Sequence, residues 1–166
     1  AIPAAGGRVE RVRLEPAQAR AYPPALRAIF SAELIVLGPG SLYTSILPNL
    51  LLGDLAEALV HARGRVVYIC NLATQPGETD GYSVADHVAA MQRHLPPGCI
   101  DVVLANDNLD VPPETGGGHT RFVLPTPPAG VAMATADLVD EARPWRHDSE
   151  KLARTVMALL ARGPGE

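Results

Sequence analysis

Three short apolar runs, at residues 34–37, 66–70 and 100–104, constrain most strongly what this chain can fold into. Almost no polar side chain interrupts them, a pattern that is typical of strands covered on both faces. Helical patterns separate the runs; after Ser83, for example, apolar residues recur every three or four positions. This alternation predicts the α/β class: a three-layer, Rossmann-like and mainly parallel sheet with helices on both faces. Two shorter apolar segments are expected to form edge strands, at residues 122–124 and 131–133.

The length and composition predict a single folded domain spanning residues 1–166. Of the 166 residues, 47% are hydrophobic, which is enough to bury one core. The net charge of −4 disfavours nucleic-acid binding, and no apolar run approaches the ~20 residues of a membrane-spanning helix. Cys70 and Cys99 form neither a metal-binding pattern nor a disulfide framework, which favours reduced thiols and a cytoplasmic location.

Capping residues predict where the helices begin. Ser83 with Asp86, and Asp54 with Glu57, match the capping-box pattern of a helix start. Asp148 is expected to cap the last helix, because an Asp carboxylate accepts hydrogen bonds from the first backbone N–H groups of a helix. The buried face of that helix is expected to consist of Leu152, Val156 and Leu159.

Glycine, proline and hydroxyl residues are concentrated in the loop after the first apolar run, at residues 38–46. Gly38 and Gly40 allow the backbone to approach a ligand closely. A helix that begins in this loop would direct its free N–H groups at the same place. The loop therefore predicts a site for a phosphate or a phosphosugar; the alternative is that Gly-Pro-Gly-Ser forms only a tight turn. The hydroxyl donors are Ser41, Tyr43, Thr44 and Ser45.

A second polar loop, residues 71–82, follows the second apolar run. Two carboxylates in this loop, those of Glu78 and Asp80, are suited to a metal ion or to sugar hydroxyls. The alternative is a solvated loop in which Thr79 and Asp80 cap the next helix. The side chains suited to hydrogen bonding with a base or a sugar are those of Asn71, Thr74 and Gln75.

Both loops follow the carboxyl ends of predicted parallel strands, where open α/β sheets bind ligands, so we expect them to lie side by side. His87, in the first turn of the next helix, is a candidate acid, base or hydrogen-bond donor at this site, and otherwise a structural residue. The other histidines lack metal-ligand spacing on one face, so no zinc site is predicted. No nucleophile elbow or Walker A lysine occurs, and no catalytic residue is assigned.

Two long segments carry a family resemblance: LIVLGPGSLYTSILPNLL, which starts at Leu34, and VVYICNLATQPGETDGYSVADHV, which starts at Val66. They resemble the signature stretches of the gluconeogenesis factor family, the bacterial YvcK-like branch of a superfamily that also contains 2-phospho-L-lactate transferase. IPAAGGRVERVRLEP near the start and RHDSEKLARTVMALL near the end are similar to the same branch. The similarity covers most of the chain and weakens between residues 107 and 145.

The resemblance implies that this chain corresponds to the carboxyl-terminal half of a longer family protein. Family members begin with a further glycine-rich strand-turn-helix and an Asp-Asp-Gly-Gly segment, which are absent from this sequence. A sheet without those front strands would present an open edge. We therefore expect the chain to form a homo-oligomer or to pair with an amino-terminal half.

The resemblance also implies a ligand. In the bacterial branch it is a UDP-sugar such as UDP-N-acetylglucosamine, and the protein has a regulatory role that supports gluconeogenic growth, cell-wall synthesis and cell shape. The phosphate contacts would fall on Gly38, Gly40, Ser41, Tyr43, Thr44 and Ser45. The other wall would be formed by Asn71, Thr74, Gln75, Glu78 and Asp80.

The transferase branch of the superfamily supplies the alternative function. Its members transfer a phosphate ester with magnesium, which would then be the cofactor. The matching residues in this sequence are too few to assign that chemistry; they include Thr44, Ser45, Ile46 and Pro48.

Overall fold

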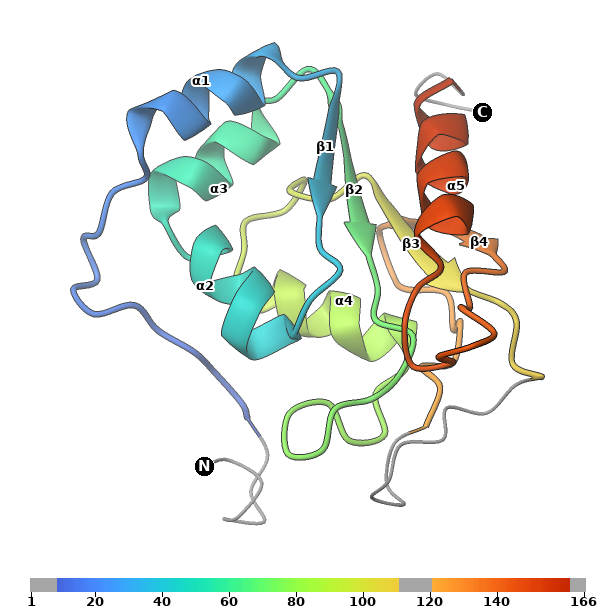
Figure 1. The fold of residues 1–166 in the computed structure, drawn as a ribbon. Coiled ribbons are helices and arrows are strands. Elements are labelled where there is room, and N and C mark those ends of the chain that lie inside the picture. Colours follow the sequence, from blue (N-terminus) through green and yellow to red (C-terminus); the bar gives the residue numbers. More distant parts are fainter. Residues whose placement is uncertain (1–8, 111–120, 162–166) are drawn as a thin grey trace.

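The structure, a computed structural model, describes residues 9–110 and 121–161. The centre of this part is a four-stranded sheet in which each strand pairs in parallel with the next. The predicted parallel α/β fold is thereby confirmed, and β4 matches the edge strand expected near residue 131. The strands, in their spatial order, are β1 (Leu34–Leu37), β2 (Arg65–Ile69), β3 (Val102–Asn106) and β4 (Ala132–Ala136) (Figure 1).

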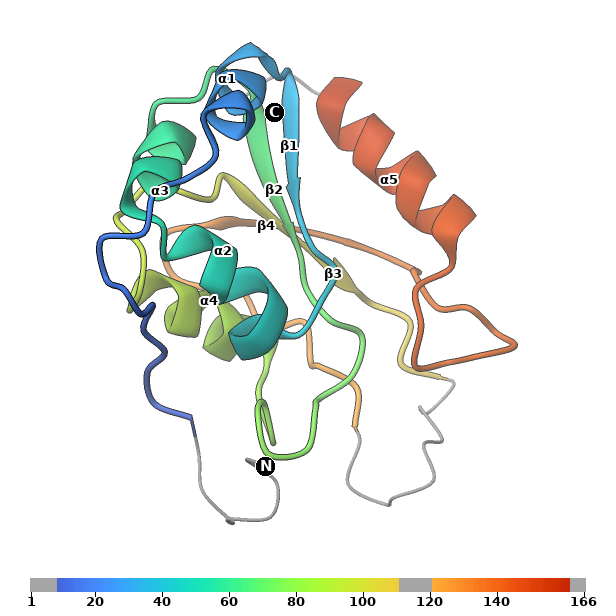
Figure 2. The same ribbon diagram turned by 60° about the vertical axis from the view of Figure 1, so that its left-hand side comes forward.

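Helices cover both faces of the sheet, as predicted. One face carries four α-helices and a short π-helix, η2, whereas α5 (Ser149–Ala161) packs on the other face (Figure 2). None of the described helices is long and apolar enough to cross a membrane. The elements on the first face are α1 (Pro23–Ser31), η2 (Leu42–Ile46), α2 (Leu47–Leu50), α3 (Gly53–Val60) and α4 (Val84–Gln92).

Alternation along the strands divides the core into two layers. In β2 and just after it, Val66, Tyr68 and Cys70 face the layer beneath α2, α3 and α4, and all three are buried. Val67 and Ile69 point the other way, toward α5. This two-sided burial explains why the sequence of β2 is almost entirely apolar. The residues that α5 contributes to its layer are the predicted Leu152, Val156 and Leu159.

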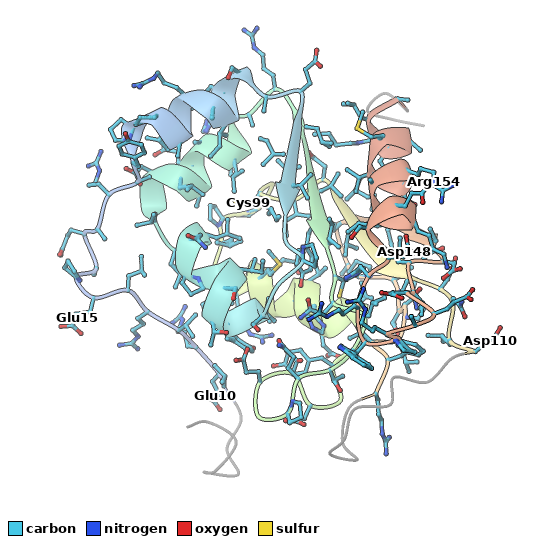
Figure 3. The ribbon with its side chains drawn as sticks, in the orientation of Figure 1. Glu10, Glu15, Cys99, Asp110, Asp148 and Arg154 are labelled. Atoms are coloured by element: carbon cyan, nitrogen blue, oxygen red, sulfur yellow. The ribbon has the colours of Figure 1, made fainter. Side chains whose placement is uncertain are left out.

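Two of the three predicted helix caps are confirmed. The Ser83 hydroxyl accepts a hydrogen bond from the backbone N–H of Asp86, and the Asp86 carboxylate accepts one from the backbone N–H of Ser83. Asp148 accepts from the backbone N–H groups of Glu150 and Lys151, and Figure 3 shows it at the start of α5. These caps fix the first turns of α4 and α5.

The capping box predicted at Asp54 is wrong. Helix α3 begins one residue earlier, at Gly53, and its N-cap Leu52 has no capping side chain. The Asp54 carboxylate instead accepts a hydrogen bond from the backbone N–H of Ala21 at 3.0 Å and pairs with Arg20. The Ala21 hydrogen bond is the main reason why the pKa of Asp54 is lowered. Asp54 therefore holds the segment before α1 against α3.

The prediction of an edge strand at residues 122–124 is also wrong. Phe122 forms an isolated antiparallel bridge with Ala73, in the second polar loop. Backbone hydrogen bonds from Thr74 to Arg121 and from Val123 to Leu72 extend this contact. The segment therefore supports the loop that was predicted to form half of the ligand site.

Candidate functional site

A polar cleft lies at the carboxyl ends of β1 and β2, where both predicted loops emerge. Its volume is about 570 Å³, within the roughly 300–1,000 Å³ that small-molecule sites occupy. Ligands of parallel α/β sheets bind at this edge because the strand-to-helix loops gather there. The cleft is lined by Gly40, Ser41, Asn71, Leu72, Ala73, Thr74, Gln75, Pro76, Glu78, Trp145 and His147.

Gly38 begins the first loop in a conformation that other residues rarely adopt. Its φ is +89°, in the left-handed region. A Cβ atom added there would lie 3.2 Å from the carbonyl oxygen of Ile69 and 3.3 Å from Cδ1 of Ile46. Both the backbone angle and the lack of space therefore require glycine, so that the chain can turn sharply from β1 into η2.

The first loop ends in a helix start, as predicted, although the first turns are a π-helix. The carbonyl oxygen of Ser41 accepts hydrogen bonds from the backbone N–H groups of both Ser45 and Ile46. The side chain of Ser41 caps no N–H group of this helix. Because the first N–H groups of a helix have no partner within it, this end favours an anionic group.

Two side-chain hydrogen bonds join the two loops. Nε2 of Gln75 donates to Oγ of Ser41 at 2.8 Å, and Oγ1 of Thr44 donates to Oε1 of Glu78 at 3.3 Å. The expectation that the loops lie side by side is thereby confirmed. Since Oγ of Ser41 accepts from Gln75, the hydroxyl proton of Ser41 stays available for another acceptor.

The structure brings together six of the predicted site residues in the cleft wall and places five elsewhere. Tyr43 turns into the core, where it is 2% exposed and its hydroxyl lies 2.9 Å from that of Tyr82. Burial, together with the bond to Tyr82, raises the pKa of Tyr43 to about 12. The residues in the wall are Gly40, Ser41, Asn71, Thr74, Gln75 and Glu78, and those outside it are Gly38, Tyr43, Thr44, Ser45 and Asp80.

Thr79 and Asp80 do not cap α4, because Ser83 has that role. The hydroxyl oxygen of Thr79 accepts a hydrogen bond from the backbone N–H of Gln75 at 2.9 Å, and Thr79 is fully buried. Oδ2 of Asp80 accepts from the backbone N–H of Gly77. Both side chains therefore stabilise the turn that presents Gln75 and Glu78.

His87 is a buried structural neighbour of the site and does not line the cleft. Its ring has no exposed surface, lies edge-on to Tyr82 at 5.4 Å between centroids, and bonds through Nδ1 to the carbonyl oxygen of Ser83. Burial lowers the pKa of His87, which favours a neutral imidazole. The structural alternative for His87 therefore fits its surroundings better than an acid–base role.

Two residues that line the cleft, Trp145 and His147, lie outside both predicted loops, and sequence reasoning missed them. They belong to the irregular segment before α5, in which Val139 and His147 form an isolated bridge. Burial lowers the pKa of His147, and a hydrogen bond with the backbone of Cys70 opposes this effect. The contact with the backbone of Cys70, just after β2, brings this segment to the cleft. His147 lies in RHDSEKLARTVMALL, which carries part of the family resemblance, but no site residue was predicted there.

A magnesium site does not assemble from the described residues alone. No group of three or more His, Cys, Asp or Glu side chains that could hold a metal ion occurs in residues 9–110 and 121–161. In the cleft wall, Glu78 contributes one carboxylate. No chemical step through a metal ion is therefore derived.

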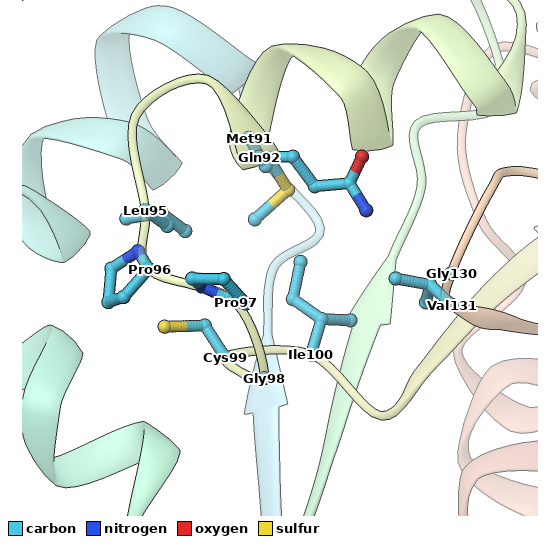
Figure 4. Close-up of a pocket in the computed structure, with 10 residues that line it drawn as sticks. All are labelled: Met91, Gln92, Leu95, Pro96, Pro97, Gly98, Cys99, Ile100, Gly130 and Val131. Carbon is cyan, nitrogen blue, oxygen red and sulfur yellow. The ribbon is translucent and has the colours of Figure 1, made fainter.

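An apolar pocket lies at the opposite end of the sheet, between the end of α4 and the starts of β3 and β4 (Figure 4). Its volume is about 340 Å³, and its polar side chains are limited to Gln92 and the buried thiol of Cys99. Burial raises the pKa of Cys99, which disfavours a reactive thiolate. The polar cleft is the better candidate site, because several hydrogen-bonding groups converge there.

The parallel sheet and its polar cleft define the class: an α/β protein of the Rossmann-like type with a ligand-sized site at the carboxyl ends of its strands. The chain belongs to the 2-phospho-L-lactate transferase CofD family, whose profile matches residues 1–161.

Several similar proteins carry the name gluconeogenesis factor. The protein of that name from Listeria innocua is 49% identical over 165 residues, which cover 96% of this chain and 51% of the relative. The one from Bacillus subtilis is 50% identical over 113 residues, 68% of this chain and 35% of the relative. The resemblance seen in the sequence is thereby confirmed.

A solved structure is also similar. A UPF0052 family member from Bacillus halodurans is 35% identical, with a TM-score of 0.83, and the match covers 94% of this chain and 53% of that one. The chain thus spans about half the length of the proteins that it matches most fully.

Proposed function

We propose that the cleft binds a UDP-sugar, such as UDP-N-acetylglucosamine. The hydrogen bond between Gln75 and Ser41 is the observation that carries this proposal, because it joins a helix start that favours anions to a loop rich in amide and carboxylate groups. The phosphates would lie at Gly40 and Ser41. The sugar or base would lie along the loop from Asn71 to Glu78.

The proposed role is regulatory and belongs to gluconeogenic growth, with effects on cell-wall synthesis and cell shape in the cytoplasm. The names of the Listeria and Bacillus relatives support the gluconeogenic part of this role. The rest follows from the resemblance of the two loop motifs. A binding protein rather than an enzyme fits a site in which the hydroxyl of Ser41 is hydrogen-bonded to the amide of Gln75, which cannot act as a general base.

Titration calorimetry tests the binding. UDP-N-acetylglucosamine is titrated into the 166-residue chain, with inorganic pyrophosphate and N-acetylglucosamine as partial ligands. We expect saturable heat with the nucleotide sugar and weaker binding of each part alone. Absence of saturable heat with UDP-N-acetylglucosamine would contradict the proposal.

A phosphate-ester transferase is the second candidate, and the family description favours it. It would use magnesium with residues outside those described. Turnover separates the two functions: the chain is incubated with a nucleotide donor and magnesium, and release of the nucleotide product is measured by chromatography. Sustained turnover above a Ser41→Ala control would favour the transferase.

A further inference from the structure

Two residues that line the cleft each have a buried polar atom without a hydrogen-bond partner among the described residues. These atoms are Oε2 of Glu78 and Nε2 of His147. Such atoms lose their hydration without compensation and are uncommon in folded proteins, so each requires an explanation. The other two buried side-chain atoms of this kind belong to Tyr68 and His87, which do not line the cleft.

The hydrogen bond to Cys70 fixes the way in which His147 presents Nε2. Because Nε2 has no partner among the described residues, we expect Nδ1 to face the Cys70 backbone and to donate its proton to the carbonyl oxygen. Burial favours the neutral ring. In a neutral imidazole only one nitrogen carries a proton, so Nε2 has a lone pair and accepts hydrogen bonds.

Glu78, in the second polar loop, also presents a hydrogen-bond acceptor without a partner. Its Oε1 accepts a hydrogen bond from the hydroxyl of Thr44 at 3.3 Å, whereas its Oε2 is buried and has no partner among the described residues. A carboxylate accepts hydrogen bonds and repels phosphate. The wall formed by Glu78 and His147 therefore selects hydrogen-bond donors, whereas Ser41 at the helix start selects an anion.

Trp145 adds an apolar surface to the wall formed by Glu78 and His147, which we call the acceptor wall. It lines the cleft two residues before His147, and 44% of it is exposed. Large exposed aromatic side chains in a cleft commonly pack against a ring of the ligand. Hydrogen-bond acceptors beside an aromatic face match a ring that carries hydroxyl groups.

We propose that Glu78, His147 and Trp145 form a subsite for the hydroxyl-bearing ring of the ligand: Oε2 and Nε2 accept hydrogen bonds from ring hydroxyls, and the indole packs against the face of the ring. This inference rests on the proposed function and deepens it, because it orients the ligand. The phosphates lie at Gly40 and Ser41, and a ribose or hexose ring lies at the acceptor wall.

The tautomer of His147 is tested first, in the ligand-free chain. ¹⁵N NMR of the histidine side chains distinguishes a protonated Nδ1 from a protonated Nε2. We expect His147 to be neutral at pH 7 with its proton on Nδ1. A proton on Nε2 at this pH would overturn the acceptor role without affecting the proposed function.

A pair of substitutions tests the subsite in binding. His147→Asn keeps an amide donor near the position of Nδ1 and removes Nε2, whereas His147→Gln places an amide oxygen near Nε2. We expect about tenfold weaker binding of UDP-N-acetylglucosamine for His147→Asn, partial recovery for His147→Gln, and unchanged binding of inorganic pyrophosphate. His61→Asn is the matched control, because the Nδ1 of this exposed histidine also contacts a backbone carbonyl, that of Glu57, away from the cleft.

The ligands themselves identify the ring. If His147→Asn weakens the binding of UDP and of UDP-N-acetylglucosamine equally, the subsite holds the ribose. If it weakens the binding of UDP-N-acetylglucosamine alone, the subsite holds the hexose.

The fluorescence of Trp145, the single tryptophan, should change with these ligands and not with pyrophosphate. Binding that depends on Ser41 but not on His147 would overturn the subsite alone. Absence of binding by any ligand would overturn the proposed function as well.

Discussion

Substitution of Ser41 is the most direct test of the proposed phosphate contact. Replacing it by alanine removes the hydroxyl proton and leaves the backbone turn in place. We expect Ser41→Ala to weaken UDP-sugar binding by roughly 1 to 2 kcal/mol, the range for a hydrogen bond to a charged group. Calorimetry measures the loss.

Ser45→Ala is the matched control for Ser41→Ala. Ser45 is an exposed hydroxyl residue of the same loop that does not line the cleft. Both variants should unfold at the temperature of the wild-type chain. Equal affinity of Ser41→Ala and wild type would mean that the first loop is only a turn.

His87 should make the stability of the chain depend on pH. Its pKa is lowered by burial in the folded state, so the unfolded chain binds a proton at a higher pH. The resulting stability is fully present above about pH 6.5, the ordinary histidine pKa, and is lost as the pH falls below that value. We expect denaturant unfolding at a series of pH values to show this decrease.

His87→Asn should reduce the loss of stability at low pH, because its amide can donate to Ser83 but does not titrate. Part of this loss should remain, since burial also lowers the pKa of His147. His61→Asn, at an exposed position, should leave the profile unchanged. An identical profile for His87→Asn would show that His87 does not contribute.

Single residues were predictable where their role is local. The capping box at Ser83 and Asp86 depends on four consecutive positions, and the structure confirms it. Tyr43 was counted as a hydroxyl donor to the cleft, but the direction of a side chain in a π-helix cannot be read from its type. Trp145 and His147 reach the cleft only through the fold, so no local pattern indicates them.

At the scale of elements, Gly64 determines how closely α1 and β2 can approach. A Cβ atom at Gly64 would overlap the backbone of Ala32 and Glu33, which connects α1 to β1. Arg65, the next residue, donates its backbone N–H to the carbonyl oxygen of Glu33 at 3.0 Å. Gly64→Ala should therefore push the start of β2 away from the connection between α1 and β1 and destabilise the fold by about 1–3 kcal/mol.

Gly53→Ala is the contrasting substitution. No atom lies within 4 Å of a Cβ added at Gly53, the first residue of α3. Alanine should leave stability unchanged or raise it by up to about 1 kcal/mol, since it restricts the unfolded chain. Chemical denaturation of both variants measures the difference, and a similar effect at the two glycines would refute the steric argument.

The strands were the most predictable elements, because burial on both faces leaves an uninterrupted apolar run. β1 matches its predicted bounds, and β2 and β3 begin within two residues of theirs. The Asp54 capping box failed because a tertiary partner, the backbone of Ala21, competes for the same carboxylate. The π-helix was not predicted, since the hydroxyl residues of 42–46 give no distinct periodicity.

At the scale of the whole molecule, the edge strand β1 should promote association. Among the described strands it pairs on one side only, with β2, and Val36 in its centre is 41% exposed. An exposed apolar edge strand favours pairing with another chain. We therefore expect the wild-type chain to self-associate, or to bind a separately supplied amino-terminal half of a family protein.

Static light scattering measures the association. Val36→Lys should reduce it, because a charge on an edge strand opposes pairing. Val60→Lys is the control, since Val60 is 37% exposed but lies on α3. A monomeric wild-type chain that binds no partner would show that the β1 edge does not drive assembly.

The strands lie in the sheet in the same order in which they occur along the chain. During synthesis, each strand can therefore pair with the one before it as soon as it has left the ribosome, without displacing a later segment. Among the described elements, α5 is the helix that covers the second face, and it is made after all four strands. Until residues 149–161 have emerged, the α5-facing side of β2 and β3, including Val67, Ile69 and Leu104, stays open to water and to other nascent chains. We therefore expect completion of α5 to protect this side of the newly made sheet from aggregation.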